Sequence, residues 1–233
     1  MKTLSLLIVV GLSLSACTTA MNTGITSNNS NRTVTEFPVE TAMINIYTKA
    51  RSERLSAVVY SLKMGAEFTV TPKGIGVFND EQVQSAEVVT VSKVEGQIVD
   101  KSVGVNYFTL NPLVFHGFTK GSGEYSIATQ IETIPKIASV GDSSTYLIEN
   151  VYSDSSKSQQ VEKFTQAWSL TQATRDTAWL RITSSENLLV GSEPDGTVDQ
   201  YYRINNKGDL LNSKLSITYP VQDVIGRLTY ISE

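Results

Sequence analysis

From about residue 55 onward, the chain alternates between short runs of β-branched and aromatic residues and short clusters of turn-forming residues. Several runs alternate apolar and polar positions with a period of two. In 214–219, for example, Leu215 and Ile217 fall on one face while Ser216 and Thr218 fall on the other. This period is typical of β-strands with one buried face. The pattern predicts strands at residues 55–62, 67–71, 87–94, 97–100, 103–110, 114–118, 125–131, 144–152, 162–171, 177–183, 187–192, 197–205 and 214–219.

Turn-forming residues separate these predicted strands. The strongest hairpin signal is Pro194-Asp195-Gly196, because proline fixes its own φ and glycine accepts the left-handed conformation that a tight turn needs. Weaker turn signals lie at Pro72-Lys73-Gly74 and at residues 95–96, 141–142 and 205–208.

One segment has helical rather than strand spacing. Between Pro38 and Arg51, apolar residues recur at Val39, Met43, Ile46, Tyr47 and Ala50. Proline suits the first turn of a helix, and this spacing places the apolar residues on one face. A short N-terminal helix is therefore predicted, with a strand as the alternative because two of its residues are β-branched isoleucines.

The predicted fold class is all-β, mainly antiparallel, as a β-sandwich or a partly closed barrel with one short N-terminal helix. Residues 103–112 and 197–206 share an aromatic pair, one further residue, an aliphatic residue and an asparagine. Two similar halves or chance would each explain this echo. The globular domain is expected over residues 37–220, and residues 221–233 fit one more strand or a loose tail.

The N-terminus carries a targeting signal. Lys2 precedes an apolar run over residues 4–14, which is too short to span a bilayer. Leu14-Ser15-Ala16-Cys17 follows and resembles the lipobox of bacterial lipoproteins. A plain secretory signal with an ordinary cleavage site is the alternative. The lipoprotein interpretation is favoured because Cys17 is the only cysteine of the chain, and a secreted protein with one unpaired thiol is unusual.

The lipobox resemblance implies that residues 1–16 are removed and that Cys17 becomes a lipidated first residue. Several acyl chains on one residue give a stable membrane attachment. Thr18 follows in place of the aspartate that resembles an inner-membrane retention signal, so we expect the outer membrane, with the periplasmic or surface face left open. Residues 17–36 are polar and aperiodic, and this is typical of a flexible tether.

Charge and composition exclude some partners. The formal net charge is −4, and the 19 lysines and arginines form no basic block. Nucleic-acid binding is therefore disfavoured. The expected partners are the membrane, through the lipid on Cys17, and either an envelope protein or a hydrophobic ligand.

Candidate catalytic residues are few. His116 is the only histidine, and Ser122, between Gly121 and Gly123, is the only serine flanked by glycines on both sides in a hairpin-like context. This serine lacks the strand–turn–helix setting of an activated nucleophile. A strand histidine and a hairpin tip are the simpler interpretations, so no catalytic residue, cofactor or metal is predicted.

Neither the possible metal ligands nor the aromatic residues predict a specific functional site. Asp142 with Asp154, and Asp195 with Asp199, are scattered carboxylates without calcium-loop spacing. Many aromatic residues fall on predicted strands, where most should be core and some could line a ligand cavity; they include Tyr107, Phe108, Tyr152, Phe164, Trp168, Trp179, Tyr201 and Tyr202. The segment 144–157 resembles strand-and-turn units of uncharacterised proteobacterial envelope lipoproteins, and this resemblance implies no activity.

Three functional hypotheses follow. The leading one is a non-enzymatic, membrane-anchored envelope lipoprotein with a binding or structural role. The second is a periplasmic carrier of a hydrophobic ligand such as a lipid or an acyl chain, which requires an apolar cavity of several hundred Å³, on the order of a small-molecule site. The third is a hydrolase that uses Ser122, His116 or a pair of carboxylates.

Overall fold

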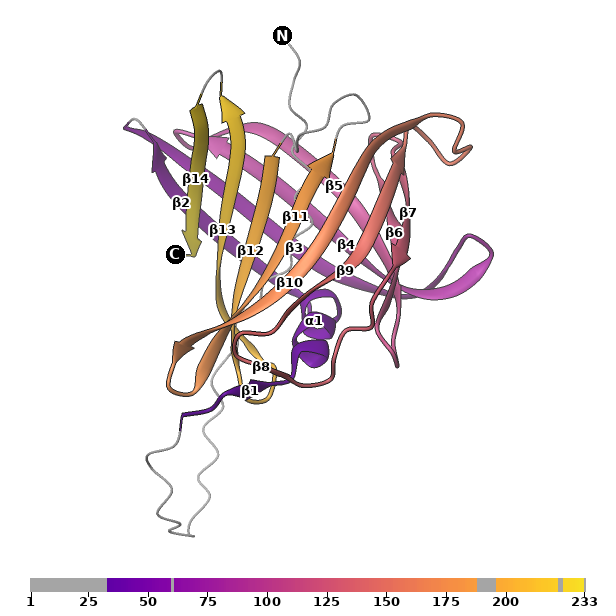
Figure 1. Cartoon of the computed structure of the whole chain (residues 1–233). Helices are drawn as coiled ribbons and strands as arrows, with labels where there is room; N and C mark the ends of the chain where they lie inside the picture. The colour runs from indigo at the N-terminus through magenta and orange to yellow at the C-terminus, as the bar shows by residue number, and fades with distance from the viewer. Residues whose placement is uncertain (1–32, 60, 188–195, 222–223, 233) are drawn as a thin grey trace.

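The computed structural model describes residues 33–59, 61–187, 196–221 and 224–232. Twelve of the described strands form one closed barrel in the order β10-β11-β12-β13-β14-β2-β3-β4-β5-β6-β7-β9, and β1 and β8 form a separate two-stranded sheet (Figure 1). The strands are β1 (Glu36–Phe37), β2 (Arg51–Val59), β3 (Leu62–Phe78), β4 (Glu81–Val94), β5 (Gln97–Thr109), β6 (Val114–Lys120), β7 (Tyr125–Gln130), β8 (Ala138–Ser139), β9 (Ser143–Tyr152), β10 (Gln160–Thr174), β11 (Thr177–Asn187), β12 (Gly196–Asn205), β13 (Leu210–Val221) and β14 (Val224–Ser232).

The barrel is an antiparallel meander. Each strand pairs with its neighbour in the chain, except that β7 pairs with β9 because β8 leaves the barrel wall. β14 closes the barrel against β2, and among the described residues Ile231 pairs with Ser56 and Ser232 with Leu55. Closure removes the unpaired edges that an open sheet would expose.

The interior of the barrel is the hydrophobic core. On β12, Gln200, Tyr202 and Ile204 are buried and point inward, whereas Tyr201 and Arg203 alternate with them and are half-buried on the outer face. Phe68, Phe108, Leu170 and Leu180 project into the same interior from other strands. The strict two-residue period of each strand thus fills the barrel with apolar side chains.

A single helix, α1 (Val39–Thr48), closes one end of the barrel (Figure 1). Its apolar face is buried against the barrel interior, with Val39, Met43 and Ile46 each 0% exposed. The ring of Tyr47 packs edge-on against Phe115, with 5.2 Å between centroids. The Arg51 guanidinium donates to the backbone oxygens of Asn45 and Ile46, so a positive charge covers the carbonyl end of the helix.

The predicted all-β antiparallel class and the short N-terminal helix are confirmed, and of the two architectures left open the barrel is the one observed. Ala50, expected on the helix face, is exposed beyond the helix end. The C-terminal stretch forms β14 rather than a loose tail, so the barrel extends past the predicted boundary at residue 220.

Three local predictions were wrong. Residues 55–62, predicted as one strand, are divided between β2, which ends at Val59, and β3, which begins at Leu62. Pro72-Lys73-Gly74 is not a turn but an irregularity inside β3, where the register shifts between Pro72 and Gly74. The turn lies at Asn79-Asp80, whose φ values of 49° and 65° suit a two-residue hairpin. Residues 97–109 form one strand instead of two. Pro194 and Asp195 lie outside the described residues.

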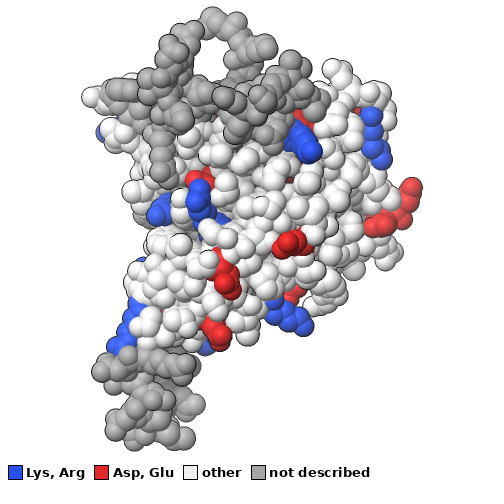
Figure 2. Space-filling view, viewed as in Figure 1, with Lys and Arg blue, Asp and Glu red and all other residues white. Residues whose placement is uncertain are grey.

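Charged side chains are scattered over the outer surface. On the face seen in Figure 2, basic and acidic residues lie singly or in mixed groups among uncharged ones, without a large patch of one sign among the described residues. Surface pairs such as Lys93 with Glu67, at 2.7 Å, combine both signs locally. The outer wall therefore offers no extended electrostatic surface on that face.

Candidate functional site

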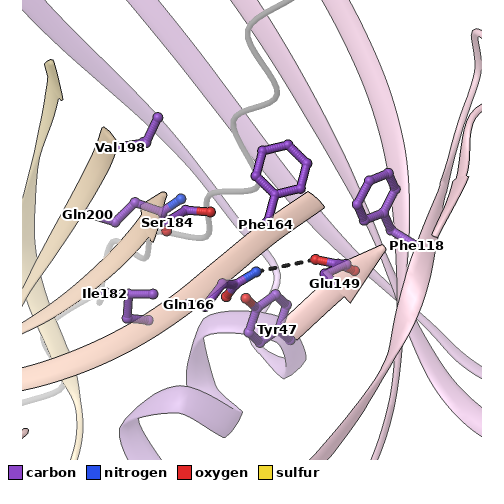
Figure 3. Close-up of a pocket in the computed structure, with 9 residues that line it drawn as sticks. All are labelled: Tyr47, Phe118, Glu149, Phe164, Gln166, Ile182, Ser184, Val198 and Gln200. Carbon is purple, nitrogen blue, oxygen red and sulfur yellow. Dashed lines mark hydrogen bonds between the residues drawn. The ribbon is translucent and has the colours of Figure 1, made fainter. Parts of the chain in front are cut away.

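A pocket lies inside the barrel, next to the C-terminal end of α1 (Figure 3). Its walls come from α1 and from five strands, β6, β9, β10, β11 and β12. Polar and apolar side chains share the lining, which comprises Tyr47, Phe118, Glu149, Phe164, Gln166, Ile182, Ser184, Val198 and Gln200. The pocket thus combines residues that are more than 150 positions apart in the sequence.

Glu149 is the acidic group of the pocket and is only 6% exposed. Its Oε1 accepts a hydrogen bond of 2.7 Å from the hydroxyl of Ser126. Its Oε2 accepts one of 3.3 Å from Nε2 of Gln166 (Figure 3). The hydroxyl of Ser126 also accepts from the backbone N–H of Phe118, at 2.7 Å. The carboxyl group is therefore fixed in place from β6, β7 and β10.

Burial changes the acidity of this group. Loss of water around Glu149 raises its pKa from the ordinary value of 4.5 to about 7, against the opposing effect of the hydrogen bonds from Ser126 and Gln166. Lys120 also lowers the pKa, but its ammonium group is 2.6 Å from Glu124 and forms its ion pair there. Near neutral pH, Glu149 is consequently divided between its neutral and charged forms.

Most of the remaining side chains that line the pocket are apolar. In Figure 3 the rings of Phe118 and Phe164 lie on one side of Glu149 and Gln166, and the ring of Tyr47 lies on the other. Ile182 and Val198 complete the apolar lining. A molecule with a polar end and an apolar body would match this division of the walls.

The pocket is small. The cavity between these side chains has a volume of about 30 Å³, within about 460 Å³ of unfilled space that includes space open to solvent. Because roughly 10–15 Å³ of cavity volume holds one water, the cavity has room for only two or three waters. The pocket in this form therefore accepts a short group and not the length of an acyl chain.

A second polar cluster lies deeper in the barrel, around Arg51 and Glu53. Burial raises the pKa of Glu53 to about 8, although the hydroxyl of Ser213 lies 2.9 Å from both of its carboxyl oxygens. Burial also lowers the pKa of Arg51 to about 10. Nε and Nη2 of Arg51 have no acceptor among the described residues. Tyr202, whose hydroxyl donates to Oε1 of Gln200 at 2.9 Å, connects this cluster to the pocket wall.

His116 and Ser122, the two residues considered for catalysis, do not line this pocket, and they contact different partners. His116 is the extra residue of a β-bulge on β6, with Nε2 3.3 Å from the hydroxyl of Thr109 and Nδ1 3.5 Å from Oε2 of Glu81. Ser122 is at the exposed β6–β7 turn, where its hydroxyl donates to Glu124 at 2.9 Å. Within the described residues, no hydrogen bond joins the serine to the histidine.

The scattered aspartates have local structural partners. Asp142 accepts from the backbone N–H of Ser139, and Asp154 from that of Ser156, both at 2.8 Å within turns. Asp199 forms a bidentate ion pair with Arg181, at 2.9 and 2.8 Å. Asp195 lies outside the described part of the chain. In that described part, no three His, Cys, Asp or Glu side chains gather to hold a metal ion.

The predicted strand aromatics divide by face. Phe108, Phe164, Trp168 and Tyr202 are buried in the barrel, and only Phe164 among the predicted set lines the pocket. Tyr107 stacks on Phe78 on the outer side, and Lys214 lies over the rings of Trp179 and Tyr201 at 4.7 and 4.5 Å. Tyr152 is half-buried.

The polar members of the pocket were missed by the sequence interpretation. Glu149 lies between inward-facing Leu147 and Val151, and Gln200 lies between Val198 and Tyr202. A polar residue at an inward position of an alternating strand is the signal that would have identified them.

Cys17, the predicted lipidation site, lies outside the described residues. Among those residues, no helix has the length and apolar character needed to cross a bilayer. No family model matches this chain, and no similar protein was found among curated proteins or solved structures.

Proposed function

We propose that this chain is a lipid-anchored, non-enzymatic binding protein of the bacterial envelope, whose barrel holds a short amphipathic ligand in the pocket beside α1. The lipid on Cys17 would attach the protein to the outer membrane, and the polar segment between Cys17 and β1 would serve as its tether. The observation that carries the binding role is the pocket itself, in which buried Glu149 and half-buried Gln166 lie next to the rings of Phe118 and Phe164.

The division of the walls supports an amphipathic ligand. An apolar body would lie against Phe164, Ile182 and Val198, where removal of apolar surface from water contributes about 25 cal/mol per Å². A polar end would reach Glu149, Gln166 or Gln200, which fix its orientation. The small volume favours a short ligand over the long acyl chain of the carrier hypothesis.

Adjacent serines on β11 allow a matched test. Ser184 lines the pocket, whereas Ser185 is the next residue of the strand and therefore points to the opposite face. Because the cavity has room for only a few non-hydrogen atoms, we would measure the binding of two-carbon probes (ethanol, ethylammonium and acetate) by isothermal titration calorimetry. Ser184→Phe should fill the pocket and reduce probe affinity at least tenfold, and Ser185→Phe should leave it unchanged.

The comparison of the two phenylalanine variants distinguishes probe binding in the pocket from probe binding elsewhere on the protein. If none of the three probes binds the wild-type protein, or if both phenylalanine variants bind them equally well, the pocket is not the binding site. Circular dichroism on each variant verifies that the barrel is folded.

A further inference from the structure

The chemistry of the pocket indicates which polar end its ligand carries. This inference rests on the proposed function, because it assigns a ligand class to the same site. Three groups of observations bear on it: the charge state of Glu149, the rings around it, and the cations near it.

Glu149 is an acid with hydrogen bonds but without an ion pair. Ser126 and Gln166 satisfy one lone pair on each oxygen, and neither donor is charged. The described residues include no lysine or arginine within ion-pair distance of this carboxylate, since Lys120 contacts Glu124 instead. An unpaired buried charge is costly, so a cation brought by a ligand would supply the missing counter-charge.

Aromatic rings surround the same carboxylate. Tyr47, Phe118 and Phe164 all line the pocket, and in Figure 3 they flank Glu149 and Gln166 from opposite sides. The face of an aromatic ring attracts a cation, and the attraction grows when water is excluded. Phe118 already lies 5.8 Å from the ammonium group of Lys120, which shows that its ring faces can accept a cation.

We propose that the ligand of the barrel pocket is a short organic amine, whose ammonium group is held by the carboxylate of Glu149 and faced by the rings of Tyr47, Phe118 and Phe164. The amine end lies beside Gln166, and the apolar body lies along Ile182 and Val198. No covalent step is involved.

This assignment predicts a pH dependence. Titratable or charged groups facing Glu149 are Tyr47 on α1, Tyr146 on its own strand and Lys120 on β6. Burial raises the pKa of both tyrosines above their ordinary value, so they remain neutral, and Lys120 keeps its pair with Glu124. Only Glu149 then changes charge near neutrality, and the ammonium ligand requires its ionised form.

The test is calorimetry with three probes of equal chain length: ethylammonium, ethanol and acetate. At pH 8 ethylammonium should bind at least tenfold more tightly than ethanol, and acetate should bind most weakly. With the pKa of Glu149 at about 7, only a few per cent of the sites are ionised at pH 5.5, so the affinity for ethylammonium should fall by about 30-fold. At pH 7 its binding should release about half a proton, measured in buffers of different ionisation enthalpy.

Two variants assign the effect. Glu149→Gln should abolish the preference for ethylammonium over ethanol and the pH dependence of that preference. Glu53→Gln is the matched control, because Glu53 is a second buried acid with a raised pKa that does not line the pocket. Should Glu149→Gln fail to fold, Phe118→Leu keeps the pocket apolar and should reduce the preference for ethylammonium over ethanol about fivefold.

The possible results are distinct. Equal binding of all three probes, or tightest binding of acetate, overturns the amine assignment while the pocket function survives if Ser184→Phe still blocks the site. A pH-independent preference for ethylammonium that persists in Glu149→Gln also overturns the amine assignment. If no probe binds at all, it is the proposed function that fails.

Discussion

Glu53 and Glu149 are acids that the fold keeps away from water, and this couples stability to pH. Burial raises their pKa values from 4.5 to about 8 and about 7. For such groups the folded state favours the protonated form, so their contribution is complete below about pH 4.5 and is lost as the pH rises through 7 and then 8. One pKa unit corresponds to about 1.4 kcal/mol. We predict that the free energy of unfolding falls by several kcal/mol between pH 5 and pH 9.

Urea denaturation at several pH values measures this decline. Glu149→Gln and Glu53→Gln should each flatten the curve, because a glutamine cannot ionise. Glu87→Gln is the control, since Glu87 pairs with Lys73 on the outer wall and should retain the wild-type slope. A stability that stays level from pH 5 to pH 9 would show that neither acid is buried as described.

Gly117 on β6 is a residue without room for a side chain. Its φ is 140°, and a Cβ placed on it would lie 2.3 Å from the carbonyl oxygen of Ser126. Because Ser126 also holds Glu149, Gly117→Ala should destabilise the protein by at least about 2 kcal/mol and weaken probe binding. Gly104→Ala, where the nearest atom is 3.6 Å away, should cost less than about 1 kcal/mol. Thermal and urea unfolding of both variants would test this, and equal stability would contradict the close approach.

At the scale of single elements, α1 contributes Tyr47 to the pocket wall and closes one end of the barrel. Ile46 is 0% exposed and packs in the core, whereas Ile44 is only partly buried at its edge. Ile46→Ala should cost about 2–5 kcal/mol, because it leaves a cavity between helix and barrel, and Ile44→Ala should cost clearly less. Chemical denaturation compares the two. Similar losses would mean that the helix is not seated as observed.

The strands and the helix could be anticipated from the sequence because each depends on local periodicity. In the run 197–205 the apolar residues Val198, Tyr202 and Ile204 fall on one face of β12, and the spacing of Val39, Met43 and Ile46 predicts α1. The turn at Asn79-Asp80 was not recognised, since it lacks the glycine that usually marks a two-residue hairpin.

Closure of the barrel and the composition of the pocket could not be anticipated in the same way. Closure depends on pairing between β2 and β14, which are about 175 residues apart, and such long-range pairing leaves no local pattern. Glu149, Gln166 and Tyr47 meet only because the barrel brings β9, β10 and α1 together. His116 and Ser122 are residue types that suggest catalysis, but His116 lies at a bulge and Ser122 lies at a turn.

At the scale of the whole molecule, the proposed attachment to the membrane can be tested at Cys17. In a Cys17→Ser precursor, radiolabelled palmitate should no longer be incorporated and the signal segment should remain uncleaved, because both steps require the thiol. The measurement is autoradiography of the immunoprecipitated protein from labelled cells, with Ser15→Ala as a control that keeps a small residue in the lipobox. Undiminished labelling of Cys17→Ser would contradict the lipoprotein assignment.

We propose that the barrel carries a small amphipathic molecule beside α1, and native mass spectrometry of the protein purified from the cells that produce it can detect such a molecule. The wild-type protein and Ser185→Phe should each retain the same added mass of a small molecule, and Ser184→Phe should lack it. An added mass that persists in Ser184→Phe, or its absence from the wild-type protein under conditions that preserve weak complexes, would contradict the account.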